Sequence, residues 1–171
     1  GLARGFHCSG TGGPKEGEVI DYSSAMVKIN EDGSVDVLTP LMDHGGGTWD
    51  AVAKIAADVL RVPLDMVGLS PADTRSPGFD VATHATRGIY CGGTAVYHVA
   101  TKVKEKLLEY AGKFMLENPK DLEVVRDDEL HQAVVRTKMY GQKGYAGKMM
   151  TAAEVADRAR IFSMGTIAYT D

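Results

Sequence analysis

The sequence predicts an α+β domain in which two to three amphipathic helices pack on a mixed sheet built from hairpins and β-α-β units. Two segments, 24–38 and 122–135, alternate apolar and polar residues around a short turn, which is typical of half-buried strand pairs. Two others, 50–60 and 96–115, repeat apolar residues at helical spacing. The order of elements also suits an α/β domain, and the hairpins favour the α+β class.

The first expected element is the hairpin at 24–38, which follows a glycine-rich loop at 1–17. Asp32-Gly33 supplies a turn in which glycine tolerates a positive φ. The apolar positions on either side of this turn alternate with other residues, so one face of the hairpin is expected to be buried: Ala25, Val27, Ile29, Val35 and Val37.

A helix is expected after the glycine-rich segment 44–48, with Asp50 as its N-cap and Pro63 as its stop. Its apolar stripe consists of Val52, Ile55, Ala56, Val59 and Leu60. Residues 66–69 suit the next strand. A long loop follows at 70–93, and long ordered loops in compact domains are often functional.

The longest helix is expected after this loop and ends at Asn118-Pro119. One of its faces is apolar: Val96, Val99, Val103, Leu107, Ala111 and Met115. A second hairpin is predicted from strands at 122–125 and 133–135, followed by a basic, mobile loop at 137–149. Thr151 and Glu154 form a capping-box signature for a short helix, and 161–169 suits a closing strand.

Length and composition indicate one globular domain over residues 1–171. The net charge is −4 and the basic residues are scattered, so nucleic acid is not an expected partner. The absence of a long apolar run or secretory signal predicts a cytoplasmic chain without a membrane partner. Cys8 and Cys91 are too few for an iron–sulfur or zinc site, and the dispersed histidines predict no metal ligated by this chain.

The glycine-rich loop after Asp43 is the first candidate site: Gly45, Gly46, Gly47 and Thr48. Glycines let a backbone approach a ligand closely, and the first amides of the following helix suit a phosphate or pyrophosphate. The segment has neither the Walker nor the Rossmann pattern. A tight strand-to-helix turn without a ligand remains an alternative interpretation.

The second candidate is the end of the long loop: Thr83, His84, Ala85, Thr86 and Arg87. Hydroxyls, backbone amides and one guanidinium gathered before a helix could bind a polyanionic, hydrogen-bonding cofactor. A solvated loop whose polar side chains bond their own backbone is the alternative. No acid–base pair stands out, so no catalytic residue is assigned. An unrelated nucleotide-binding domain also remains open.

Several motifs occur in the order in which a known family has them. Asp43-His44-Gly45-Gly46-Gly47 stands where that family has Asp-x-Gly-Gln-Gly, and residues 56–63 are similar to its Ala-Ala-Glu-x-Leu-Gly-x-Pro. Ala85-Thr86-Arg87 is similar to its Ala-Ser-Arg, and residues 92–96 to its Gly-Gly-Asn-Ala-Val. The chain therefore resembles the molybdopterin-binding large subunit of the xanthine dehydrogenase/aldehyde oxidase family, the molybdenum hydroxylases.

The resemblance implies that both candidate loops contact molybdenum-molybdopterin, often in its cytosine dinucleotide form, with Thr86 and nearby backbone groups bonding it from the second side. It also implies [2Fe-2S] and FAD on partner subunits or domains. The expected partners are the rest of the large subunit, the iron–sulfur and flavin subunits, and a small-molecule substrate. That substrate would be a purine or other heterocycle, an aldehyde or an aromatic thioester.

Three departures from the family pattern matter. Gly46 replaces the usual Gln, and Ile89 stands where Thr is common. The family's catalytic glutamate lies in a Gly-x-Gly-Glu motif, which this sequence does not contain. Gly17-Glu18 stands at another place and in another context. Because the chain also opens at Gly1, we expect a fragment of a larger oxidoreductase that is inactive alone. The alternative is a non-catalytic ligand-binding or scaffold module that keeps the fold.

Overall fold

The computed structural model describes residues 1–6, 22–70, 72–75, 78–81, 83–162 and 164–170. Predictions for the N-terminal glycine-rich loop beyond residue 6, including Cys8, fall outside these residues. The described strands are β1 Met26–Ile29, β2 Val35–Leu38, β3 Val67–Ser70, β4 Leu122–Asp127, β5 Gln132–Thr137, β6 Met149–Thr151 and β7 Ala168–Thr170. The helices are α1 Thr48–Leu60, α2 Thr94–Met115 and α3 Ala152–Ile161.

The main sheet has the strand order β3-β2-β1-β7. The predicted first hairpin is confirmed, because β1 and β2 are antiparallel with Val27 opposite Val37. Strand β7 is antiparallel to β1 on the other side. Strand β3 is parallel to β2, and α1 connects the two as the crossover of a β-α-β unit. The sheet is therefore mixed, as the sequence predicted.

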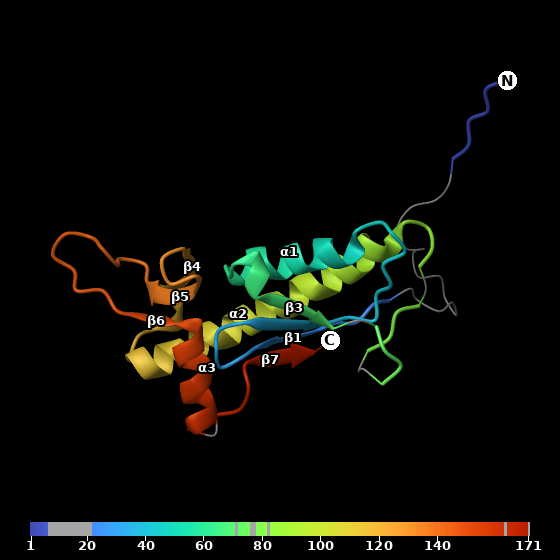
Figure 1. The fold of residues 1–171 in the computed structure, drawn as a ribbon. Coiled ribbons are helices and arrows are strands. Elements are labelled where there is room, and N and C mark those ends of the chain that lie inside the picture. The colour runs from blue at the N-terminus through green and yellow to red at the C-terminus, as the bar shows by residue number, and fades with distance from the viewer. Residues whose placement is uncertain (7–21, 71, 76–77, 82, 163, 171) are drawn as a thin grey trace, which may run out of the picture.

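Helices α1 and α2 lie side by side over one face of this sheet (Figure 1). The alternate apolar residues of β1 and β2 are fully or almost fully buried beneath them. The predicted apolar faces of both helices are confirmed, since Val52, Ala56 and Leu60 of α1 and the apolar stripe of α2 are buried. Each fully buried Val or Leu stabilises the fold by roughly 1.5–3 kcal/mol.

A smaller antiparallel sheet has the order β4-β5-β6, and α2 contacts both sheets. The predicted second hairpin is confirmed, with Val124 opposite Val135. Strand β6 was not predicted, because its three residues are too short to show an alternation. The predicted capping box is also confirmed: Thr151 Oγ1 accepts from the Glu154 amide, and Glu154 Oε2 accepts from the Thr151 amide.

Three local predictions are wrong. Asp50 lies inside the first turn of α1, because the left-handed backbone of Gly47 starts the helix earlier. The long loop ends before residue 93, since Gly88–Gly93 forms a π-helical turn that leads into α2. The closing strand is much shorter than 161–169, because α3 runs on to Ile161 and the chain then turns at Gly165, whose φ is 91°.

Among the helices that the structure describes, none combines the length and apolar character needed to cross a membrane.

Candidate functional site

The two candidate loops leave the same end of the main sheet. One follows β2 and the other follows β3, and these two strands are parallel. In parallel sheets, ligands are commonly bound outside the carboxyl ends of the strands, where such loops meet. Both α1 and α2 also begin at this end of the molecule (Figure 1). The topology thus brings together segments that are about forty residues apart in the sequence.

The loops meet in one pocket of about 320 Å³. Most of the residues proposed from the sequence are in its lining: Gly46, Thr48, Thr83, His84, Ala85, Thr86 and Arg87. Gly45 and Gly47 flank Gly46 without being part of the lining. His44, Gly88 and Ile89 complete the pocket and were not among the candidates. In the sequence, His44 lies inside the first motif, Gly88 follows the second, and Ile89 is one of the departures from the family pattern.

The side chain of Asp43 organises the glycine-rich loop. Its Oδ1 accepts hydrogen bonds from the backbone amides of Gly45 at 2.8 Å and Gly47 at 3.2 Å, and its Oδ2 accepts from the Trp49 amide at 3.2 Å. Gly45 and Gly47 have φ values of 101° and 74°, which favour glycine. The Gly45 amide, followed by that of Trp49, holds the pKa of Asp43 below its ordinary value.

This arrangement changes what the loop can offer a ligand. The sequence suggested that the first amides of α1 would be available to a phosphate, but the Asp43 carboxylate accepts from the Trp49 amide in the first turn and from the Gly45 and Gly47 amides before the helix. A negative charge at a helix N-terminus is stabilised by the helix dipole. The Asp43 carboxylate therefore lies at this helix end, and the loop contributes Gly46 and Thr48 to the lining of the pocket.

Trp49 and Leu41 fix the loop to the rest of the site. The Trp49 indole Nε1 donates to the carbonyl oxygen of Leu41 at 2.8 Å. The Leu41 side chain is buried against the π-helical turn at Gly92. On the other side of the pocket, Thr48 is the nearest neighbour of Gly88. The glycine-rich loop and the start of α2 are thus packed directly against each other.

The second loop has an unusual backbone where it lines the pocket. Ala85 and Thr86 are consecutive left-handed residues, with φ values of 47° and 57°. This conformation is costly for residues with a Cβ, and most of all for a β-branched residue such as Thr86. Backbone strain of this kind persists only where the surrounding structure enforces it, and it is found preferentially at functional sites.

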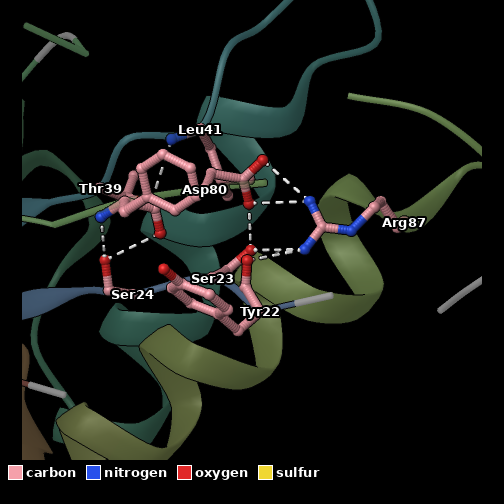
Figure 2. Close-up of polar contacts among 8 residues, drawn as sticks. Tyr22, Ser23, Ser24, Thr39, Leu41, Asp80 and Arg87 are labelled. Atoms are coloured by element: carbon pink, nitrogen blue, oxygen red, sulfur yellow. Dashed lines mark hydrogen bonds and ion pairs between the residues drawn. The ribbon is translucent and has the colours of Figure 1, made fainter. Parts of the chain in front are cut away.

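Arg87 lies directly after this strained pair and its side chain is fully buried. Its Nη1 donates to both carboxylate oxygens of Asp80, at 2.8 and 3.0 Å. Its Nη2 donates to the Tyr22 carbonyl oxygen at 2.9 Å and to Ser23 Oγ at 3.2 Å, as Figure 2 shows. Ser23 Oγ in turn donates to Asp80. Sequence reasoning identified Arg87 as a site residue but had no signal for this buried network.

A second cavity of about 400 Å³ adjoins this network. Asp80 is part of its lining, together with Pro40, Met42, Ala72, Asp73, Thr74, Gly78 and Phe79. Asp73 and Thr74, which belong to the long loop after β3, therefore lie at the same end of the sheet as the first pocket. A wider groove of about 570 Å³ runs along α2 and β7, is lined mainly by Lys and Glu side chains, and contains no residue of either motif.

The first pocket suits an organic ligand with many hydrogen-bonding groups. Its lining provides threonine hydroxyls, two imidazoles and exposed backbone. Across the described residues, no three His, Cys, Asp or Glu side chains gather closely enough to hold a metal ion. The donor set therefore suits a polar organic ligand.

Comparisons with known proteins agree with this geometry. The profile of the molybdopterin cofactor-binding domain family matches residues 1–170. A probable hypoxanthine oxidase of Escherichia coli is 30% identical over 105 residues, which are 61% of this chain and 11% of that protein. A xanthine dehydrogenase of Emericella nidulans is 32% identical over 103 residues, which are 60% of this chain and 8% of that protein.

Solved structures show the same fold. Quinoline 2-oxidoreductase from Pseudomonas putida 86 superposes with a TM-score of 0.74 and 27% identity over 90% of this chain and 19% of its own. A CO dehydrogenase from Oligotropha carboxidovorans superposes with a TM-score of 0.73 and 23% identity over 90% of this chain and 18% of its own, which supports the fold alone. This chain thus spans about a tenth of the curated relatives and about a fifth of these solved chains. It belongs to the molybdopterin cofactor-binding domain family and corresponds to one segment of a molybdenum hydroxylase large subunit.

Proposed function

We propose that this chain forms part of the molybdopterin site of a larger molybdenum-dependent oxidoreductase. The observation that carries the proposal is the single pocket into which both family motifs converge from the ends of β2 and β3. The threonine hydroxyls and imidazole rings of its lining suit a ligand that is held by several hydrogen bonds. The residues proposed to form the cofactor site are Gly45, Gly46, Gly47, Thr48, Thr83, His84, Ala85, Thr86 and Arg87.

The chain's own contribution is binding and orientation. Thr48 and Thr86 bring hydroxyl groups from opposite loops, and His44 and His84 add ring nitrogens. Gly46 has no side chain, so a contact there comes from the backbone alone. When bound, molybdopterin supplies the redox chemistry at molybdenum, and the protein groups around it determine its position and its electrostatic surroundings.

The finer features of the proposal rest on the resemblance and on the names of the relatives. They are a cytosine dinucleotide form of the cofactor, and [2Fe-2S] and FAD on partner subunits or domains. Relatives include the large subunit of a nicotine 6-hydroxylase from Paenarthrobacter nicotinovorans and a nicotinate hydroxylase from Emericella nidulans. Because these names refer to nitrogen heterocycles, we place such a heterocycle before an aldehyde or an aromatic thioester as the substrate.

The test uses the full-length subunit purified with its native partners. Molybdenum is measured by elemental analysis, and the pterin by its fluorescence after oxidative release. Thr48→Val removes one of the three threonine hydroxyls of the pocket lining at constant shape, and Thr86→Gly removes a second while keeping a left-handed backbone. Each variant is expected to lower cofactor retention by about tenfold, the lower range for losing an interaction that supports a metal site.

Thr101→Val is the matched control, because the Thr101 hydroxyl donates to the Tyr97 carbonyl within α2 and lies outside the pocket. Retention in this variant should equal that of the wild type. A folded wild-type protein that carries neither molybdenum nor pterin would instead favour the non-catalytic scaffold. The hydrogen bond from the Trp49 amide of α1 to the Asp43 carboxylate is the observation on the side of that alternative.

A further inference from the structure

The guanidinium of Arg87 joins two other segments of the chain. Its terminal nitrogens donate to the carboxylate of Asp80, which precedes the strained loop. They also donate to the carbonyl oxygen of Tyr22 and the hydroxyl of Ser23, which precede β1. The exposed fraction of the side chain is 0% for Arg87 and 7% for Asp80. A charged pair this deeply buried is maintained only with complete, well-oriented hydrogen bonding.

The same two segments are joined independently of Arg87. Ser23 and Asp80 form an isolated antiparallel bridge, and the Val81 amide donates to the Tyr22 carbonyl at 3.3 Å. Ser24 Oγ accepts from the Phe79 amide at 2.6 Å, and the Tyr22 and Phe79 rings are 5.5 Å apart. The entrance of the second loop is therefore anchored to residues 22–24, just before β1, and Arg87 bonds its exit to residues 22 and 23 of the same segment (Figure 2).

The loop between these two anchor points is short and strained. Only six residues separate Asp80 from Arg87, and they include the left-handed pair Ala85 and Thr86 that lines the pocket. Strain of this kind relaxes when one end of a loop is released. The ion pair thus has the right placement to keep Ala85 and Thr86 in the conformation that shapes the pocket wall.

We infer that Arg87 is a positioning residue, which acts through Asp80 and residues 22–23 to hold the loop 83–86 in its pocket-lining conformation. This inference rests on the proposed function for what the pocket binds. It adds to that function by assigning the Arg87 guanidinium the role of supporting the loop that lines the pocket. It differs from the simpler assignment in which Arg87 binds an anionic part of the cofactor directly. The two assignments predict different effects of Asp80→Asn: a positioning role predicts faster loss of cofactor, and direct binding by Arg87 predicts none.

The experiment is a double-mutant cycle in the full-length holoenzyme with Arg87→Lys and Asp80→Asn. Lysine keeps the charge but cannot reproduce the fork that spans both Asp80 oxygens and Tyr22. Two properties are measured: the rate at which pterin and molybdenum are lost on dilution, and hydrogen exchange of the amides of 83–89. Arg160→Lys and Asp157→Asn, an exposed pair on α3, are the matched controls.

For a positioning role, each single variant should lose cofactor about tenfold faster than the wild type, a typical effect of disturbing a supporting contact. Exchange of the 83–89 amides should rise in both variants, and the double variant should be no worse than either single one, because the two residues act as one unit. The controls should match the wild type in both measurements.

Two results would overturn the inference. Asp80→Asn that retains cofactor as well as the wild type while Arg87→Lys loses it would show direct binding by Arg87. A lower melting temperature in both variants with unchanged exchange at 83–89 and unchanged cofactor loss would show a purely structural pair. If the wild type holds no molybdopterin but both variants raise exchange at 83–89, the proposed function fails while the control of the loop by Arg87 stands.

Discussion

Gly92 lies so close to Leu41 that a Cβ atom at position 92 would come within 2.1 Å of Leu41 Cδ1. The π-helical turn that starts α2 is thereby pressed against the segment that leads into the glycine-rich loop. Leu41 itself is buried and its carbonyl oxygen accepts from the Trp49 indole. One leucine therefore sets the separation between the two loops that form the pocket.

Gly92→Ala should destabilise the 171-residue chain by about 1–3 kcal/mol, because the added methyl group forces Leu41 or the turn to move. Urea unfolding followed by the fluorescence of Trp49, the single tryptophan, measures this change. Gly88→Ala is the control, since the nearest atom to its Cβ is 3.9 Å away on Thr48. The control should be neutral or stabilising by up to about 1 kcal/mol. Equal losses in the two variants would contradict the close packing at Leu41.

Arg87→Met should lower the free energy of unfolding by about 3–5 kcal/mol, because it leaves the Asp80 carboxylate buried without its partner. Replacing both partners, in Arg87→Met/Asp80→Leu, should recover most of that loss. Arg160→Met breaks an exposed pair with Asp157 and should cost no more than about 1 kcal/mol. Urea unfolding of the four chains provides the comparison, and a small effect of Arg87→Met would show that the pair is not a tightly bonded buried one.

The predictable parts of the fold are those encoded by local periodicity. The alternation around Asp32-Gly33 predicted the first hairpin, and the apolar stripe from Val96 onward predicted the long helix, because both patterns repeat over several residues. The closing strand failed for the opposite reason. Only three residues pair there, and tertiary contacts with β1 rather than local pattern decide where they begin.

The site was predictable in part. Both loops could be identified from their glycines and hydroxyls, and the parallel pairing of β2 and β3 explains why they share a pocket. The sequence could not show that Asp43 accepts from the loop amides, or that the Arg87 guanidinium pairs with Asp80. Asp43 and Arg87 depend on side-chain directions that only the folded backbone fixes. Whether the loop predicted at 137–149 is mobile stays a prediction.

The capping box at the start of α3 is expected to contribute to the stability of the chain. Thr151→Ala removes the hydroxyl that accepts from the Glu154 amide at 3.1 Å, and should destabilise the chain by about 1 kcal/mol. Thr101→Ala is the control, since its hydroxyl lies within α2 and does not cap a helix end. Thermal unfolding of both variants measures the difference. A Thr151→Ala chain as stable as the control would show that α3 does not depend on its cap.

Asp43 should make stability depend on pH in the acid range. Its pKa in the folded chain is lowered by the loop amides, so the unfolded state binds a proton more readily than the folded state does. The stabilisation is therefore fully present above the unfolded pKa of about 4 and is lost as pH falls through the lower folded value. The advantage of the wild type over Asp43→Asn should shrink as pH falls below about 4.

Urea unfolding of the wild type and of Asp43→Asn in a series of buffers from about pH 6 to about pH 3 measures this difference. Asp50→Asn removes a carboxylate from the same helix end, but one that pairs with Lys54 and leaves the loop amides with their acceptor. This control should follow the wild type across the series. If Asp43→Asn follows the wild type as well, the loop amides are not held by the charged carboxylate, and they become available to an anionic ligand after all.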